Sequence, residues 1–196
     1  MPETSDRRTL YTRAVIKDAF LALIASGGWR RLSVTLLCKK AGIARATFYL
    51  HYANLDEVLD DVLRDAFQVG DGDIRRVLRQ LRQTMKAGTL TADAFLPLCQ
   101  RAADSPRYRP LLLDEDLPGR ILSFLYDTAR ADIVPLLMES ASLTQQEADL
   151  LFRFGLQGSF AVNAALRWEK NETWYSMQDL ILRFKMGGLE ALQKRK

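Results

Sequence analysis

The sequence predicts an all-α protein, and three observations favour this fold class. Apolar residues recur with the 3.6-residue period of amphipathic helices, no tract of five or more residues alternates in the manner of a β-strand, and Gly and Pro punctuate the helical segments without forming linkers. The chain has 196 residues, of which 48% are hydrophobic and 27% are charged. Such a composition is typical of globular proteins, and the length suffices to bury a core without disulfides or a structural metal.

The predicted helices follow from apolar faces and from residues that start or stop a helix. In chain order they cover approximately residues 10–26, 34–41, 45–51, 55–86, 91–104, 106–114, 118–140 and 144–168, with a final helix opened by residues 176–179. Side-chain caps are expected at four of the helix starts: Ser33, Asn54 with Glu57, Thr144 with Glu147, and Ser176 with Asp179. Gly70-Asp71-Gly72 is expected to interrupt or kink the long fourth helix, and Pro135 to kink or end the helix that contains it.

Positive charge is concentrated in the first quarter of the chain. Residues 1–55 hold nine Lys/Arg and three acidic residues, a formal charge of +6, whereas the rest of the chain carries −2. This asymmetry favours a polyanionic partner at one end of the molecule, although surface lysines and arginines alone also produce such an imbalance.

Neither membrane insertion nor secretion is predicted. No apolar stretch approaches the roughly 18 uninterrupted residues of a membrane span, and the start MPETSDRR lacks the apolar run of a signal peptide. We therefore expect a cytoplasmic protein without a membrane partner. Cys38 and Cys99 lie singly inside helical apolar patterns with no His cluster nearby, so both are expected to be core residues rather than zinc or redox sites.

Residues 34–51 have the arrangement of a helix-turn-helix, in which the last helix enters the major groove of DNA. Gly42 allows the turn a left-handed backbone, and Ile43 and Phe48 would anchor the third helix on the first two. The remaining side chains would face outward: Arg45, Ala46, Thr47, Tyr49, Leu50 and His51. The Arg45 guanidinium suits a bidentate contact with guanine, whereas Thr47, Tyr49 and His51 are expected to bind phosphate oxygens. The alternative is that Gly42 only separates two packing helices, with Tyr49 and His51 satisfying polar groups of the core.

Two segments, Gly28–Val34 (GWRRLSV) and Ala41–Tyr52 (AGIARATFYLHY), together resemble the N-terminal signature of TetR-family transcriptional regulators. The resemblance covers about residues 10–65 and is specific in the order and spacing of its motifs. It implies that a head of residues 1–53 binds double-stranded DNA through its helix-turn-helix. It also implies that residues 54–196 form a helical body that binds a small-molecule effector and forms a homodimer through the last two helices.

Carried over residue by residue, the resemblance implies DNA contacts at seven positions: Ser33, Thr35, Arg45, Ala46, Thr47, Tyr49 and His51. Ser33, Thr35 and His51 would lie against phosphate, and the others would read bases or the adjoining backbone. Two positions depart from the family pattern, because Ala44 replaces a capping Ser or Thr and Leu55 replaces a lysine that opens the fourth helix. Each change weakens a local interaction, and Arg7, Arg8 and Arg13 are candidates to compensate.

Small residues crowd one stretch of the helix that Thr144 opens: Gly155, Gly158, Ser159, Ala161, Val162 and Ala165. Small side chains allow two helices to approach closely, which suits either a homodimer seam or a tight monomeric core. The resemblance favours dimerisation, so we expect the interface to include Gly155, Gly158, Ser159, Val162, Ile181 and Phe184.

Aromatic and apolar residues of the middle helices are candidates to line an effector cavity: Phe95, Leu98, Cys99, Tyr108, Leu112, Ile121, Phe124, Leu125 and Phe154, together with Gln157. An aromatic stripe with helical spacing also fits an ordinary core. Arg120, Arg153 and Gln157 would orient a polar group of the effector unless they lie on the surface.

No catalytic constellation is found in the sequence. His51 is the only histidine, and no paired Cys/His set, Gly-rich phosphate loop or GxSxG motif occurs. The acidic groups Asp60-Asp61 and Asp114-Glu115-Asp116 are interpreted as solvated helix edges. We therefore expect no catalysis, no cofactor and no metal, and we interpret the protein as a ligand-responsive repressor that binds a palindromic operator as a homodimer. The alternative is a helical interaction module that retains the scaffold without operator binding.

Overall fold

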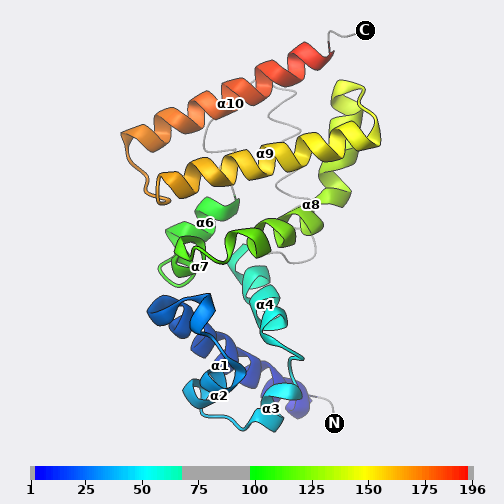
Figure 1. The fold of residues 1–196 in the computed structure, drawn as a ribbon. Helices are drawn as coiled ribbons and strands as arrows, with labels where there is room; N and C mark the ends of the chain where they lie inside the picture. Colours follow the sequence, from blue (N-terminus) through cyan, green and yellow to red (C-terminus); the bar gives the residue numbers. More distant parts are fainter. Residues whose placement is uncertain (1–2, 68–97, 194–196) are drawn as a thin grey trace.

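The described part of the chain, residues 3–67 and 98–193 of a computed structural model, is helical and contains no strand (Figure 1), which confirms the predicted fold class. Its helices are α1 (Glu3–Gly27), α2 (Val34–Ala41), α3 (Arg45–Tyr49), α4 (Leu55–Phe67), α6 (Leu98–Asp104), α7 (Arg109–Leu113), α8 (Pro118–Ala141), α9 (Gln145–Ala165) and α10 (Glu172–Gln193), with a short 3-10 helix η1 (Trp29–Arg31) after α1.

The molecule is elongated, with a head at one end and a larger helical body at the other. Figure 1 shows α1, α2 and α3 grouped around the N-terminal end, α4 leading from this head into the body, and α9 and α10 lying side by side at the far end. Helices α6, α7 and the start of α8 occupy the space between the head and the two long C-terminal helices. The head is therefore presented as a separate end of the molecule.

Three of the four predicted side-chain caps are confirmed. The Ser33 hydroxyl accepts a hydrogen bond from the Leu36 N–H at the start of α2 (3.2 Å), and the Asn54 side chain accepts one from the Glu57 N–H at the start of α4 (2.9 Å). Thr144 and the carboxylate of the glutamate three residues later form a complete capping box at α9. These bonds satisfy N–H groups that have no partner inside a helix.

The fourth predicted cap is wrong, because α10 begins earlier than expected. The helix starts at Glu172, and the Asn171 side chain accepts a hydrogen bond from the Trp174 N–H (2.9 Å). Ser176 and Asp179 consequently lie inside the helix. The capping pattern at residues 176–179 misled the prediction because Asn171 is an equally good cap and is followed by Trp174, which is buried.

The start of α1 also differs from the prediction, whereas the bounds of α8 agree with it to within one residue. Helix α1 begins at Glu3 rather than near residue 10. Once the apolar face of residues 16–24 has formed the helix, its extension into the polar N-terminal residues does not require further apolar residues there. Helix α8 continues through Pro135 to Ala141, so the proline does not end it. The ribbon of α8 changes direction along its length (Figure 1), as expected where a proline removes a backbone hydrogen bond. The Gly70-Asp71-Gly72 interruption lies outside the described residues.

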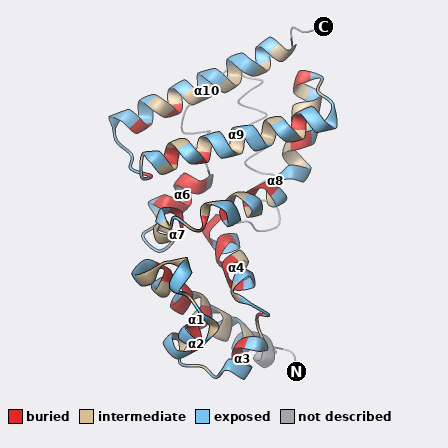
Figure 2. Cartoon of the chain, viewed as in Figure 1, coloured by how far each residue is buried: buried red, intermediate tan, exposed pale blue. Residues whose placement is uncertain are grey.

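A continuous hydrophobic core joins the head to the body (Figure 2). It extends from Ile16 and Phe20 in α1, through Phe48 and α4, to Trp168 after α9. Both cysteines are free and buried, as predicted, and burial raises the pKa of the Cys99 thiol to about 12.

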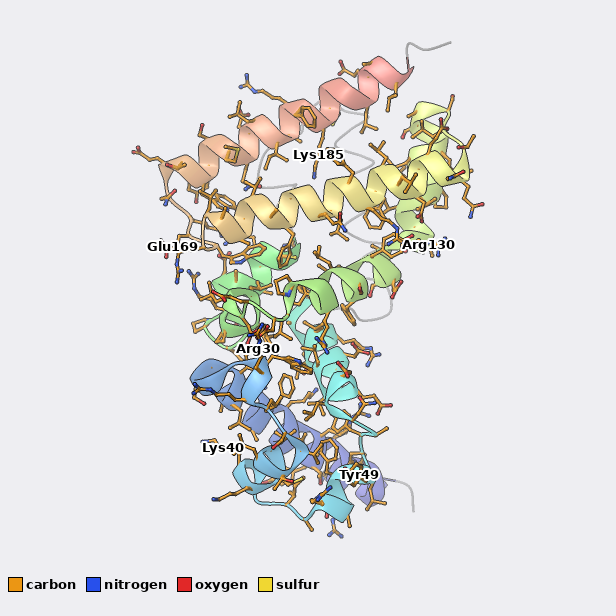
Figure 3. All side chains as sticks on the ribbon, viewed as in Figure 1. Arg30, Lys40, Tyr49, Arg130, Glu169 and Lys185 are labelled. Carbon is orange, nitrogen blue, oxygen red and sulfur yellow. The ribbon has the colours of Figure 1, made fainter. Side chains whose placement is uncertain are left out.

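A buried amide sets the register between α9 and α10. The side-chain oxygen of Asn163, which is fully buried, accepts hydrogen bonds from Trp174 Nε1 (2.8 Å) and Gln178 Nε2 (3.2 Å). The Lys185 ammonium of α10 also donates to the Ser159 hydroxyl of α9 (2.7 Å), and Figure 3 shows this side chain pointing from one helix to the other. Because a buried polar group without a partner is costly, these bonds favour one alignment of the two helices.

Within residues 3–67 and 98–193, no helix has the length and hydropathy required to cross a membrane. The same residues contain no group of three or more His, Cys, Asp or Glu side chains that is arranged to hold a metal ion.

Candidate nucleic-acid interface

A left-handed glycine sets the angle between α2 and α3. Gly42 adopts φ 67° and ψ 31°, and its N–H bonds to the carbonyl groups of Cys38 and Lys39. The next residue, Ile43, also donates its N–H to the Cys38 carbonyl (3.1 Å). A residue with a side chain is strained at such a positive φ, so the turn depends on glycine at this position.

Helix α3 is held by a single buried aromatic ring. Phe48 has no exposed surface and lies against Tyr49 and Tyr52, with ring centroids 5.3 and 6.1 Å away. The helix has only five residues, and its N-cap Ala44 makes no side-chain hydrogen bond. A helix this short is not stable alone, so its position follows from the burial of Phe48.

The predicted DNA-contacting residues lie on the surface of the head. Ser33, Thr35, Arg45, Ala46 and Tyr49 are exposed, whereas Thr47 and His51 are partly buried. Tyr49 is 51% exposed, and Figure 3 shows it at the end of the head remote from the body. Its hydroxyl hydrogen-bonds Arg45, one turn earlier, and this bond raises the pKa of the Arg45 guanidinium.

Basic residues of the head fall into two groups, which the sequence did not distinguish. Arg13, Lys17 and Arg30 form ion pairs with carboxylates. The others form no ion pair with a described residue: Arg7, Arg8, Arg31, Lys39, Lys40 and Arg45. Unpaired cations are available to phosphates, so this second group supplies the head's free positive charge.

The proposal that Arg13 compensates for the missing contacts is not supported by its surroundings. Its guanidinium donates to the Tyr52 hydroxyl (3.2 Å) and to Asp61 Oδ2 (3.1 Å) and lies over the Tyr52 ring, 5.0 Å from the centroid. The Tyr52 hydroxyl itself donates to Asp61 (2.6 Å), and Lys17 lies 3.6 Å from the same carboxylate. Arg13 therefore ties α1 to α4 and to the residues that follow α3.

This network shifts the pKa values of its acidic members. Burial raises the pKa of Tyr52, and the hydrogen bond to Asp61 raises it further. Burial alone would raise the pKa of Asp61, but the hydrogen bond from Tyr52 and the charges of Lys17 and Arg13 outweigh it, so the pKa is lowered overall. Asp61 is thus a partly buried, paired carboxylate, and its interpretation as a solvated helix edge is wrong.

The second acidic group, Asp114-Glu115-Asp116, was likewise interpreted as a solvated edge, and this too is wrong for two of its members. Asp114 accepts a hydrogen bond from the Trp29 N–H (2.8 Å), and Asp116 accepts one from Arg30 Nε (2.7 Å). Figure 3 shows Arg30 at the junction of the head and the body. Carboxylates of the α7–α8 loop therefore hold the turn that follows α1.

The turn after α1 can lie this close to Asp114 of the α7–α8 loop because residue 28 is glycine. Gly28 has φ +73°, and a Cβ atom at this position would lie 3.1 Å from Asp114 Oδ2. Both the backbone conformation and the close carboxylate disfavour a side chain there.

Arg120 of α8 makes a second connection between the body and the head. Its guanidinium lies over the Trp29 ring, 4.5 Å from the centroid, and Nε donates to Asp56 Oδ1 at the start of α4 (2.9 Å). The position of the Arg120 guanidinium therefore depends on both the Trp29 ring and the Asp56 carboxylate.

An open groove of about 770 Å³ lies between α4 and α8, and we call it the α4–α8 groove. It is lined by Asp56, Leu59, Asp60, Arg64, Asp116, Gly119, Arg120, Ser123, Phe124, Asp127 and Thr128. Another surface hollow, of about 310 Å³, lies between α1 and the residues around Pro106.

The predicted cavity residues are not all brought together. Phe124 lines the α4–α8 groove, whereas Tyr108 packs against the core. Phe154, which is 62% exposed, and Gln157 lie on the exposed side of α9. Phe95 and the side chain of Leu98 lie outside the described part of the chain. Arg120 lines the groove, but Arg153 bonds Asp149 and stacks on Tyr126 elsewhere in the body.

The predicted interface residues share the outer pair of helices. Gly158 and Phe184 are exposed, and Gly155, Ser159, Val162 and Ile181 are partly buried within this single chain. Leu150 and Leu180, which the prediction did not include, are also large and exposed on α9 and α10.

The geometry of residues 33–52, with a capped helix, a left-handed glycine and a short exposed helix anchored by one aromatic ring, defines a helix-turn-helix. Residues 16–62 match the family described as bacterial regulatory proteins, tetR family. The predicted resemblance is therefore confirmed, and residues 16–62 contain the helix-turn-helix segment that the TetR family model describes.

Two relatives with curated descriptions are similar to this chain. One, an uncharacterized HTH-type transcriptional regulator, YxbF, of Bacillus subtilis, is 37% identical over 60 residues, which are 30% of this chain and 16% of that protein. The other, an uncharacterized HTH-type transcriptional regulator of Haemophilus influenzae, is 32% identical over 87 residues, which are 42% of this chain and 40% of that protein. The similarity therefore spans less than half of either relative.

The Asp61 network predicts an acid-sensitive contribution to stability. Because the pKa of Asp61 is lower in the folded chain than that of a free aspartate, its charge stabilises the fold above the unfolded pKa, and this contribution is lost as the pH falls through the folded value. The difference in unfolding free energy between the wild type and Asp61→Asn should be largest near pH 7 and should shrink below about pH 4. Urea denaturation at a series of pH values measures it. Asp179→Asn, in an exposed ion pair with Arg183, is the control, and an equal pH dependence for both variants would contradict the prediction.

The uncapped start of α3 predicts a stabilising substitution. Ala44 has the extended backbone of an N-cap, with φ −72° and ψ 150°, but no side-chain acceptor. Ala44→Ser should supply that acceptor and raise the unfolding free energy by about 1 kcal/mol. Ala46→Ser, at the second position of the helix rather than at its cap, should bring no gain. Equal urea midpoints for wild type and Ala44→Ser would show that another group satisfies these N–H donors.

Proposed function

We propose that the protein is a ligand-responsive repressor that acts in the cytoplasm and binds an inverted-repeat operator as a homodimer. The observation that carries this proposal is the exposed α3, which presents Arg45 and Tyr49 and lies inside the region that matches the TetR family, on a head that also carries other unpaired cations. Arg45 would read a base in the major groove, while Tyr49 and His51 would bind phosphate. Ser33 and Thr35, at the start of α2, would bind the adjoining backbone.

Dimerisation through α9 and α10 is supported by the surface of these helices. Large apolar side chains lie exposed on both, including Phe154 at 62% and Phe184 at 70%. Several large apolar side chains exposed on neighbouring helices often mark a protein interface. The glycines on the same helices, Gly158 and Gly188 among them, have open space where a Cβ atom would lie. Packing within the single chain therefore does not require glycine at these positions, whereas a closely approaching second copy would.

Effector control would act by shifting populations between two arrangements of the dimer. A dimer reads two half-sites about 34–36 Å apart, and an effector that binds better to a conformer with a different spacing releases the operator. The α4–α8 groove is the described site from which this could act, because it shares Arg120 and Asp56 with the contacts that hold the head. A division of the chain into a DNA-binding part of residues 1–53 and a body of residues 54–196 is part of this proposal.

The test is selection of DNA duplexes from a random pool by the purified full-length chain, followed by fluorescence anisotropy of the selected duplex at several salt concentrations. The proposal requires an enriched inverted repeat that binds a dimer with an affinity that falls steeply as salt rises. A folded dimer that enriches no sequence would instead favour the interaction-module interpretation, in which Ala44 and Leu55 mark a head that no longer reads DNA.

Arg45 and His51 should have different effects on operator binding. Arg45→Ala should relax specificity at one base pair of each half-site, with a loss of affinity of about five- to a hundredfold for the selected base. His51→Ala should weaken binding to all sequences alike, because a phosphate contact carries no base specificity. Anisotropy with single-base operator variants distinguishes the two. A uniform loss for Arg45→Ala would place Arg45 against phosphate rather than a base.

Phe184 provides a test of the interface. Phe184→Glu would bury a carboxylate between two copies, so we expect a monomer at micromolar concentration in sedimentation velocity. Leu50→Glu, at an 83% exposed position on the head, is the matched control and should leave the dimer intact. A dimer that survives Phe184→Glu would locate the interface on another surface.

A further inference from the structure

The α4–α8 groove has two walls of known chemistry. One is the face of α4 that carries Asp56, Leu59 and Asp60, and the other is the face of α8 that carries Arg120, Phe124 and Asp127. Leu59 and Phe124 offer apolar surface, while the polar lining contains four carboxylates and two guanidinium groups. The groove thus combines an apolar floor with an excess of negative charge.

One positively charged side chain of the protein, Arg120, already lies against a carboxylate of the groove. The guanidinium of Arg120 lies against the Asp56 carboxylate at 2.9 Å and against the Trp29 ring, although both partners of the ion pair remain about half exposed. A planar amidinium or guanidinium group therefore fits the Asp56 side of the groove, because the chain places one there itself. The exposure of the pair allows a ligand to reach it.

The other three carboxylates of the groove differ in whether they form an ion pair. Asp116 is paired with Arg30, which belongs to the head, but Asp60 and Asp127 form no ion pair with a described residue. Burial raises the pKa of Asp60, and the neighbouring charges of Asp56 and Glu57 raise it further, while Arg64 opposes them. A cation placed in the groove would offset this unfavourable potential. The described carboxylates do not converge on a point as metal ligands would, so the charge favours an organic cation over a metal ion.

We propose that the α4–α8 groove binds an organic cation with an apolar body, using Asp60 and Asp127 and competing with Arg120 for Asp56. This inference rests on the proposed function, since it names the chemical class of the effector. The apolar body would lie against Leu59 and Phe124. The charged group would take the place that Arg120 occupies beside Asp56 or would lie between the two unpaired carboxylates.

Occupation of the groove would change the contacts of the head through Arg120. A ligand that displaced the Arg120 guanidinium from Asp56 would break the ion pair that orients this guanidinium over the Trp29 ring. In the sequence, Trp29 is the first residue of η1, between the end of α1 and Arg30. The Trp29 N–H is bonded to Asp114 in the same turn. The groove therefore has a direct connection to the head that does not pass through the length of α4.

The test uses three small probes of nearly equal shape and different charge: benzamidinium, benzamide and benzoate. Each is titrated into the isotopically labelled full-length chain at constant ionic strength, and amide chemical shifts of Gly119, Ser123 and Thr128 report the groove. Benzamidinium should bind and the other two should not. Asp60→Asn and Asp127→Asn should each weaken its binding by about two- to fivefold. Arg120→Gln should strengthen it by a similar factor, because it leaves Asp56 without its internal cation.

Asp179→Asn, on α10, is the control for a change of charge outside the groove and should leave the dissociation constant unchanged. Equal binding of benzamide and benzamidinium would overturn the proposal, as would an unchanged constant in both Asp60→Asn and Asp127→Asn. Operator affinity measured in the same solutions tests the proposed function separately. If benzamidinium binds in the groove and operator affinity does not change, the cation site is supported and effector release through this groove is rejected.

Discussion

The head depends on the burial of one ring, that of Phe48. Helix α3 has five residues and an N-cap without a side-chain acceptor, so its own hydrogen bonds are too few to keep it folded. The ring is completely buried against α1 and α2, and the aromatic side chains on either side of it diverge, with Tyr49 outward and Tyr52 inward. Because α3 is anchored from one side only, the residues on its other side are not needed to hold the helix in place. In the proposed function, the outward residues are therefore available for contacts with DNA.

Tyr52 connects this anchor to the rest of the molecule. Its hydroxyl bonds Asp61 of α4, and Arg13 of α1 bonds both. The end of α3 is thereby fixed to the helix that leads into the body. At the opposite side of the head, Asp114 and Asp116 hold the turn after α1, and Arg120 lies on Trp29. The head thus meets α4 and the body at two places, both built from charged groups at the edge of a shared apolar core.

Local signals in the sequence were sufficient for the helices but not for these contacts. Ser33, Asn54 and Thr144 cap helices through bonds to residues three positions away, and Gly42 ends α2 through its own backbone, so each is legible in a short window. The partners of Asp61 and Asp114 lie 48 and 85 residues distant. No periodicity encodes such pairs, and an acidic pair on a polar helix face looks the same whether it is solvated or joined to another element. The same limit explains why Phe154 was assigned to an interior: an aromatic at helical spacing indicates a face, and the sequence does not say what covers that face.

The glycine at position 28 has a consequence for sequence variation in related chains. Its positive φ and the 3.1 Å approach of Asp114 to the site of an absent Cβ atom make residues 28 and 114 a steric pair as well as members of one hydrogen-bonded turn. A side chain at position 28 therefore meets two independent obstacles, a strained backbone and a carboxylate that would have to move by a few tenths of an ångström. Loss of the Asp114 carboxylate removes only the second obstacle, so glycine remains favoured at position 28 even when its neighbour changes.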